Sequence, residues 1–229
     1  MNDRFLRLWH EVSFSKIEFN RSPNSKSNYK WFPYNKGGGF QKFYGSNEYV
    51  CNWENDGNEI KNFKNENGKV RSRAQNSQFY FRRGITFNLT GGFSTRFKDE
   101  GFLFDVQGSS LFPTDQYIYP LIGFLNSKLV QPLLRITNPT MVTQVGDLKL
   151  LPVSFDNTHP NFKEIGKLSQ SLVSLYKRLW DLNEFSWEFE TFSSENKPYN
   201  IKTYFNLYNE FLINHINQIR HTESSLNEL

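Results

Sequence analysis

The sequence has few of the cysteines and histidines that form disulfide bonds and metal sites. Cys51 is the single cysteine among 229 residues, so neither an intrachain disulfide nor a cysteine-based zinc site can form. Its neighbours Val50 and Asn52 offer no base that would activate the thiol, which indicates a small buried residue in a strand. The four histidines are scattered along the chain and form no ligand pair.

Long apolar runs are missing as well. No segment approaches the roughly 18 apolar residues that a membrane-spanning helix requires. The first residues, MNDRFLRLWHEV, do not resemble a signal peptide. We therefore expect a cytoplasmic protein with no membrane partner.

The motifs of DNA base chemistry are also absent. An amino-methyltransferase needs a glycine-rich cofactor loop and an Asn/Asp-Pro-Pro-aromatic tetrad that holds the flipped base. The nearest tetrad, Asn138-Pro139-Thr140-Met141, lacks the second proline and the aromatic ring, and it predicts a turn. We expect this chain not to be catalytic by itself and to hold neither a metal nor a cofactor.

One enzymatic alternative stays open, a metal-dependent nuclease. Asp56, Glu59 and Lys61 have suitable residue types in a D-x-x-E-x-K order. The two acids lie in one short polar segment, however, whereas such sites use carboxylates on two facing strands. A cleavage assay with magnesium decides this alternative, and we expect no cleavage.

The chain is rich in aromatic and basic residues. It contains 23 Phe, 11 Tyr and 5 Trp, which excludes a disordered chain. Lys plus Arg exceed Asp plus Glu by 27 to 23, and this balance permits a nucleic-acid partner without requiring one. Between residues 65 and 96, however, Glu66 is the only acid among several lysines and arginines.

The segment Lys30–Phe63 combines bare backbone, positive charge and aromatic rings. Its three consecutive glycines let the backbone approach another surface closely, and the lysines around them suit a polyanion. The alternative is a surface loop that its aromatic residues pack against a sheet. The candidate contacts are Lys30, Lys36, Gly37, Gly38, Gly39, Gln41 and Lys42.

The segment Lys69–Asn76 holds all four residue types that read base edges in the major groove, namely Arg and Lys for guanine, and Asn and Gln for adenine. The alternatives are a solvated basic surface, or phosphate contacts that position the protein without reading sequence. The candidates for this DNA-facing surface are Lys69, Arg71, Arg73, Gln75, Asn76, Arg82, Arg83, Thr86, Ser94 and Arg96.

The pattern along the chain predicts an α+β fold. Residues 1–155 are expected to form a β-rich domain with a buried helix, and residues 156–229 a helical extension that acts as a spacer or docking element. Four features of the first part are expected from local composition. They are strands at 48–53, 78–81 and 84–87, a hairpin of 93–97 with 102–106, an exposed loop at 54–74, and a short strand at 148–153.

Apolar residues at spacings of three and four predict the helices. The first covers residues 118–133, with Pro120 and Pro132 as kinks or boundaries. The second is a long amphipathic helix that ends near residue 182, with Thr158 as its N-cap. The third follows a polar break at 193–198 and covers residues 201–219.

Four long strings occur in a familiar order. They are WFPYNKGGGFQKFYGSNEYVCNWENDGNEIKNF, RSRAQNSQFYFRRGITF, GFSTRFKDEGFLFDVQGSSLFP and IGFLNSKLVQPLLRITNPTMVTQVGDLKLLPV. They resemble the C-terminal half of the PglX family, the adenine-specific DNA methyltransferases of BREX phage-defence systems. The same region resembles the target-recognition portion of fused restriction-modification enzymes. The SWEF at residues 186–189 resembles that family's S-W-D-F, with Glu188 in place of Asp.

The resemblance implies a module that recognises double-stranded DNA. In the family, a methyltransferase domain with the cofactor loop and the N-P-P-Y tetrad lies upstream, and neither motif occurs in this sequence. The implied partner is therefore that catalytic domain, in cis or in trans, and S-adenosylmethionine would be its cofactor.

A second hypothesis is a protein-interaction module, in which the aromatic surface and the last helices bind other defence proteins or a phage inhibitor. A Leu212→Asp substitution would separate the two hypotheses: loss of partner binding with DNA binding intact would favour docking, whereas unfolding would decide nothing.

Overall fold

The computed structural model describes residues 2–71, 74–153, 156–192 and 200–229. Its helices are α1 Asn2–Phe5, α2 Glu54–Lys61, α3 Asp115–Asn126, α4 Val130–Thr137, α5 Val145–Leu148, α6 Phe162–Asp181 and α7 Ile201–Glu228. Its strands are β1 Leu6–Leu8, β2 Trp31–Asn35, β3 Tyr49–Asn52, β4 Gly84–Phe87, β5 Thr95–Lys98, β6 Leu103–Phe104 and β7 Ser110–Leu111. The expected α+β class is confirmed.

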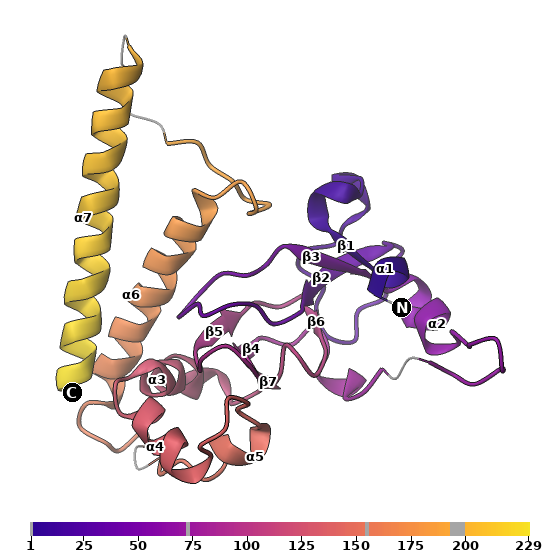
Figure 1. Cartoon of the computed structure of the whole chain (residues 1–229), viewed down its shortest axis with the longest axis horizontal. Coiled ribbons are helices and arrows are strands. Elements are labelled where there is room, and N and C mark those ends of the chain that lie inside the picture. Colours follow the sequence, from indigo (N-terminus) through magenta and orange to yellow (C-terminus); the bar gives the residue numbers. More distant parts are fainter. Residues whose placement is uncertain (1, 72–73, 154–155, 193–199) are drawn as a thin grey trace.

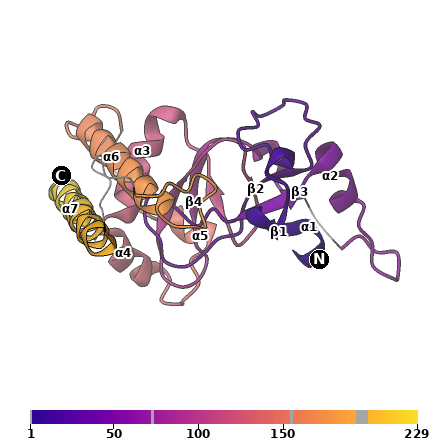
Figure 2. The ribbon, with the colours of Figure 1, turned by 90° about the horizontal axis from the view of Figure 1, so that it is seen from above.

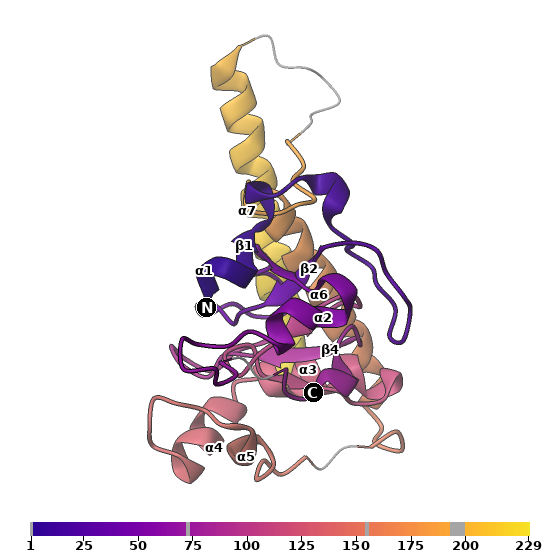
Figure 3. The same cartoon turned by 90° about the vertical axis from the view of Figure 1, so that its right-hand side faces the viewer.

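Two small sheets lie in the middle of the molecule. The α6–α7 pair lies at one end, and α1 and α2 lie at the other (Figures 1 and 2). Helices α4 and α5 lie below the sheets (Figure 3). No helix within the described ranges is long and apolar enough to cross a membrane.

The first sheet has the order β1-β3-β2-β6. Its centre is antiparallel, with Cys51 of β3 opposite Leu6 on one side and Phe32 on the other. Cys51 is buried there, as the sequence predicts. Strand β6 joins the sheet in parallel, with Leu103 opposite Tyr34. One hydrophobic cluster lies against this sheet and includes Phe32, Trp53, Tyr80, Phe81, Leu103 and Phe104.

The second sheet has the order β5-β4-β7, with Ile85 of β4 between Phe97 and Leu111. The second hydrophobic cluster joins this sheet to the helices, since it includes Ile85, Ile118 of α3, Leu172 of α6 and Ile219 of α7. This core therefore takes residues from both sides of position 155. The division into two domains there stays a prediction.

The long helices follow the predicted apolar spacing. Helix α6 packs against α3, where Gly123 leaves room for the hydroxyl of the fully buried Ser169. His215 of α7 is buried and hydrogen-bonds through Nε2 to the Leu175 carbonyl of α6, at 2.8 Å. The Asn200 side chain accepts a hydrogen bond from the Thr203 backbone N–H and caps α7. The predicted break at 193–198 lies outside the described residues.

The helix expected at 118–133 is two helices, α3 and α4, because the chain turns at 127–129. Pro132 therefore lies in the first turn of α4, where a missing N–H costs little. The strand expected at 148–153 is wrong, since Leu150 and Leu151 make local turn bonds to Asp147 and Leu148.

The N-cap expected at Thr158 is also wrong. Thr158 donates its hydroxyl to Asp156 in the preceding turn, and α6 begins only after Asn161. Helix α4 ends at the expected Asn138-Pro139 turn, where the Asn138 carboxamide accepts from the Thr140 N–H and donates to Asp147.

The hairpin of 93–97 with 102–106 is wrong. Residues 101 and 102 bond to Phe81 instead, through Gly101 N–H to the Phe81 carbonyl and Phe81 N–H to the Phe102 carbonyl. This contact turns the chain away from β5 and leads β6 into the first sheet. Phe81 itself has left-handed backbone (φ 65°), so the strand expected at 78–81 is a 3-10 turn, Ser77–Phe79.

The loop expected at 54–74 begins with α2 instead. Asn55, Asp56 and Gly57 all have left-handed backbone there, a conformation that Asn, Asp and Gly tolerate best. The chain then leaves the body of the molecule as a hairpin-like extension.

Candidate nucleic-acid interface

Residues 61–71 form an extension that we call the basic finger. Its two arms pair through Lys64 and Val70, and the Arg71 N–H donates to the Phe63 carbonyl at 2.9 Å. At the tip, the Asn65 side chain accepts from the Lys69 N–H, and the Asn65 N–H donates to the Lys69 carbonyl. The finger projects from the end of the molecule opposite α6 and α7 (Figures 1 and 2).

The finger carries exposed positive charge. Lys61, Lys64, Lys69 and Arg71 are all exposed, and Glu66 is the single acid, so four cations and one anion leave a net charge of +3. Its base is fixed to the body by Phe63, whose ring packs edge-on against Phe5 with centroids 5.4 Å apart. A rigid base with a charged tip suits contact with a polyanion.

Two further predicted contacts, Gln75 and Asn76, are exposed, and their role in reading bases stays a prediction. Asn76 has left-handed backbone (φ 58°) and precedes the 3-10 turn. Lys69 and Arg71 lie on the finger, whereas Gln75 and Asn76 follow it in sequence. The predicted candidate Arg73 lies outside the described residues.

Arg82 and Arg83 are exposed at a second place. Their guanidinium groups lie over Phe79 and Phe97, at 5.4 and 6.0 Å from the ring centroids. Both line a depression of about 380 Å³ beside the start of α3, together with the acids Glu100 and Asp115. This site is electrostatically mixed, unlike the finger.

Three predicted contacts, Thr86, Ser94 and Arg96, must be corrected because they are buried. Both faces of β4 and β5 are covered, so the polar face that the sequence predicts for DNA is inside the protein. Thr86 hydrogen-bonds with Asn35, and Arg96 donates weakly to the Gly39 carbonyl at 3.5 Å. Burial lowers the pKa of Arg96 to about 10, although Glu48 partly opposes this shift.

The glycines of the segment 36–42 serve contacts within the chain. Gly37 has φ of 84°, and a Cβ there would lie 2.6 Å from the Gln107 carbonyl oxygen. A Cβ on Gly38 would lie 2.7 Å from the Ser46 hydroxyl oxygen, and the Gly39 carbonyl accepts from Asn88 at 2.5 Å. The geometry supports the alternative of a loop packed against a sheet.

The polar residues of this segment also have partners in the chain. Lys42 lies 3.5 Å from Glu223 of α7, and Lys36 lies over the Tyr49 ring at 4.2 Å. Lys30 lies 3.8 Å from Glu54, and the Gln41 amide donates to the Tyr44 carbonyl. These residues are dispersed, so the structure separates them from the finger.

The acids of the nuclease alternative are paired with arginines. Asp56 accepts from the buried Arg21 at 2.6 Å, and Glu59 accepts from Arg4 at 2.8 Å. The hydrogen bond from Arg4 lowers the pKa of Glu59. In the part of the chain that the structure describes, no three His, Cys, Asp or Glu residues are grouped so as to hold a metal.

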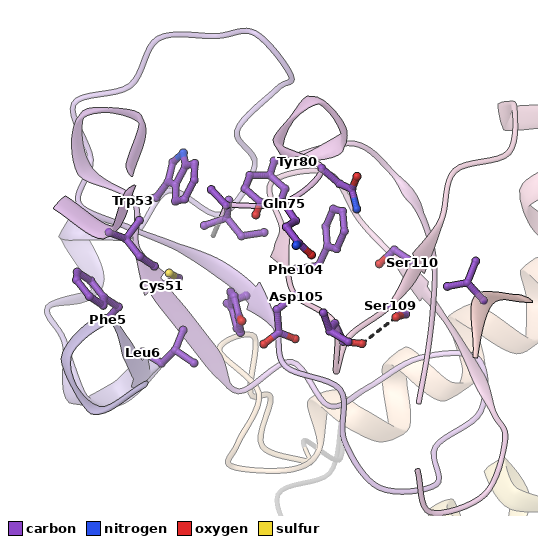
Figure 4. A pocket seen from close by; sticks show the side chains of 17 residues that line it. Phe5, Leu6, Cys51, Trp53, Gln75, Tyr80, Phe104, Asp105, Ser109 and Ser110 are labelled. Atoms are coloured by element: carbon purple, nitrogen blue, oxygen red, sulfur yellow. Dashed lines mark hydrogen bonds between the residues drawn. The ribbon is translucent and has the colours of Figure 1, made fainter. Parts of the chain in front are cut away.

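A cavity of about 350 Å³ lies next to the finger, between the first sheet and residues 74–80 (Figure 4). Tyr80 forms part of its wall and lies between Trp53 and Phe104, with both pairs of ring centroids 5.2 Å apart and edge-on. Its polar lining residues are Gln75, Asn76, Asp105, Ser109 and Ser110. Sequence reasoning missed most of this site because its residues come from distant segments. Only Gln75 and Asn76 were candidates.

The chain is similar in sequence to part of a larger known protein. No family model matches it. It is 34% identical over 239 residues to the adenine-specific methyltransferase PglX of Lacticaseibacillus casei (strain Zhang), covering all of this chain and 20% of that protein. The chain is homologous to part of these methyltransferases. The resemblance to PglX is thereby confirmed.

A second relative extends this result. The adenine-specific methyltransferase BrxX of Escherichia coli O9:H4 (strain HS) is 35% identical over 200 residues, covering 85% of this chain and 15% of that protein. The chain thus spans about a fifth or less of the PglX and BrxX relatives. A segment of that size is consistent with the C-terminal region that the motifs indicated.

Proposed function

We propose that this chain recognises double-stranded DNA for an adenine-specific methyltransferase of the PglX and BrxX type. The observation that carries the proposal is the basic finger, a paired extension with net charge +3 in a segment homologous to these enzymes. The major groove admits a two-stranded ribbon, and lysine and arginine are the side chains that bind phosphate and guanine.

The contacts divide by chemistry. Lys61, Lys64 and Lys69 supply point charges for phosphate, whereas Arg71 has the planar fork that fits a guanine edge. Gln75 and Asn76 offer the paired donor and acceptor that fit adenine. Arg82 and Arg83 would hold phosphate further along the duplex.

Catalysis would belong to a partner domain. We place S-adenosylmethionine and the adenine-holding tetrad in a catalytic domain that acts with this chain in cis or in trans, within phage defence. Support comes from the small share of the relatives' length that this chain covers.

Salt dependence of binding tests the proposal. If Lys61, Lys64, Lys69, Arg82 and Arg83 each neutralise one phosphate, a plot of log K against log salt has a slope of about −4.5. Affinity for duplex DNA then falls about five-hundredfold between 50 and 200 mM salt. We expect this in a fluorescence-anisotropy titration of random-sequence duplex. Binding that ignores salt, or no binding by the chain with or without a catalytic domain, would refute the proposal.

A second candidate function is docking onto the rest of the methyltransferase. Along the first half of α7, Ile201, Phe205 and Ile213 are 88%, 60% and 58% exposed. They occupy about a third of the helix circumference. Next to this stripe, Tyr204, Tyr208 and Phe211 pack around the Phe192 ring. An exposed apolar stripe of this kind suits a protein partner.

Docking is tested with Phe205→Asp/Ile213→Asp, which is better placed than Leu212→Asp because Leu212 is half-buried. We expect the double variant to lose co-purification with a separately expressed catalytic domain while its own affinity for duplex DNA is unchanged. Asn206→Asp, an exposed change on the same helix, should behave as the parent chain. Retained co-purification by the double variant would contradict the docking proposal, and a melting curve confirms that each variant is folded.

A further inference from the structure

The cavity beside the finger has the dimensions and lining of a ligand site. Its volume of about 350 Å³ falls at the lower end of the range for small-molecule pockets. Phe5, Tyr34, Trp53, Tyr80 and Phe104 line it, so a planar ligand would find aromatic surface there. Figure 4 shows Phe5 and Trp53 at the left of the cavity, with Phe104 and Asp105 near its middle and Ser109 further right.

The polar side of the cavity is rich in acceptors. Asp105 is fixed in place because its Oδ1 accepts from the Gln107 and Gly108 N–H groups, at 2.8 and 3.2 Å. Ser109 donates its hydroxyl proton to the Val106 carbonyl, and Ser110 donates to the Gly108 carbonyl. Both serine oxygens therefore face a ligand as acceptors. A complementary ligand must carry N–H donors.

The charge of the cavity disfavours the phosphate of a nucleotide and favours its base. None of the described residues that line it is lysine or arginine, and Asp105 is its one acid. A phosphate would be repelled there. Burial, and after it the charge and hydrogen bond of Asp105, raise the pKa of Tyr34, so the phenol stays neutral.

We propose that this cavity binds an amino-bearing nucleobase, with the ring stacked on the aromatic wall and the exocyclic amine donating to Asp105. Proteins that extrude a base bind it by this combination of stacking and edge hydrogen bonds. The base comes either from a free nucleoside or from a nucleotide extruded from DNA. Only the second source rests on the proposed DNA recognition. Gln75 and Asn76 also line the cavity.

The first experiment measures nucleoside binding by the full chain, with 2-aminopurine riboside as the fluorescent probe and adenosine as the competitor. We expect saturable binding with quenching, and displacement by adenosine. Purine riboside, which lacks the amine, should bind at least tenfold more weakly. Asp105→Asn keeps an acceptor for Gln107 and Gly108 but places a donor in the cavity, and it should weaken 2-aminopurine riboside at least tenfold.

Glu210→Gln, an equal change of charge on the exposed face of α7, should leave nucleoside affinity unchanged. Binding that is equally strong in Asp105→Asn overturns the proposal, because the ligand then lies elsewhere. Absence of saturable binding at millimolar nucleoside, together with no response in the duplex experiment below, overturns it as well.

The second experiment identifies the source of the base. A duplex carries 2-aminopurine opposite either thymine or an abasic site, where extrusion costs least. If DNA supplies the base, 2-aminopurine emission from the abasic duplex changes when the protein binds. Asp105→Asn should remove this change. Its affinity for the duplex, measured by fluorescence anisotropy, should stay the same. A nucleoside response without a duplex response supports the cavity with a free nucleoside as ligand. Loss of DNA binding alone refutes only the proposed DNA recognition, so the two failures are separable.

Discussion

The double variant Lys69→Glu/Arg71→Glu is expected to bind duplex DNA at least a hundredfold more weakly than the parent chain at 100 mM salt. Two favourable contacts at the end of the finger are lost and two repulsive ones replace them, which costs about 3 kcal/mol or more. Both side chains are exposed, and the arms pair through backbone atoms. The free energy of unfolding should therefore change by no more than about 0.5 kcal/mol.

The matched control is Lys163→Glu/Lys167→Glu, which makes the same change of net charge on the exposed face of α6. We expect it to lower DNA affinity only slightly, because α6 lies at the end of the molecule opposite the finger (Figure 2). Equal losses in the two variants would mean that net charge, and not the finger, attracts the DNA.

Neutral substitutions sharpen the same test. Lys69→Gln/Arg71→Gln removes two cations without adding repulsion. Because Lys69 is assigned to phosphate and Arg71 to a guanine edge, the double variant should reduce the slope of log K against log salt by about 1. An unchanged slope would show that Lys69 does not contact phosphate, whatever the affinity does.

The long helices could be predicted because their information is local. The spacing of Leu172 and its neighbours sets which face of α6 is buried, and the same holds for Ile219 on α7. The turn at Asn138-Pro139 and the strand around Cys51 follow from similarly local patterns. Such features need no knowledge of what the segment contacts.

Strand pairing could not be predicted, because contacts between distant residues decide it. The segments 93–97 and 102–106 look like two arms of a hairpin, but the hydrogen bonds of Phe81 with Gly101 and Phe102 take the second arm away. The parallel pairing of β6 with β2 joins Leu103 to Tyr34 across nearly 70 residues. No spacing rule within either segment encodes that partner.

The candidate site was predictable where exposure follows from local polarity. The finger is polar and glycine-bearing, and it is exposed as expected. Thr86, Ser94 and Arg96 are polar as well, yet distant segments cover them. The Gln41 N–H bonds to Ser94 and the Gly39 carbonyl to Arg96, whereas Asn35 and the Ser109 carbonyl bond to Thr86. A local sequence pattern cannot predict that a distant segment will bury these side chains.

Lys98 of β5 is also buried. Its side chain is 2% exposed, its ammonium donates to the Arg82 carbonyl, and it lies 5.1 Å from the Phe112 ring centroid. Within the described ranges no carboxylate forms an ion pair with it. Burial lowers the pKa of Lys98 to about 7, and the charges of Asp99 and Glu100 oppose the shift only in part.

The depressed pKa makes stability depend on pH in a defined direction. Between about pH 7 and the ordinary lysine pKa of 10.5, the unfolded chain binds a proton that the folded chain does not. Lys98 therefore contributes a rise in the free energy of unfolding with pH in this window, by at most about 1.4 kcal/mol per unit. Below pH 7 Lys98 is protonated in both the folded and the unfolded chain, so it no longer makes the free energy of unfolding depend on pH.

The rise should end near pH 9. Burial raises the pKa of Cys51 to about 12 from 9.0, and that of Tyr80 to about 12 from 10.0. Above these ordinary values the unfolded chain loses protons that the folded chain keeps, so stability falls with further increase in pH. The protein is thus expected to be most stable in mildly alkaline solution.

Lys98→Met isolates the contribution of the buried ammonium. Urea unfolding at pH 7, 8 and 9 should show the parent chain gaining about 2 kcal/mol across this range, whereas the variant stays nearly flat. The exposed Lys163→Met should keep the full parental slope. Methionine fills a similar volume without a charge, so the variant should also be the more stable protein at pH 7. Parallel pH curves for Lys98→Met and the parent chain would show that Lys98 is charged in the folded protein and hydrated there.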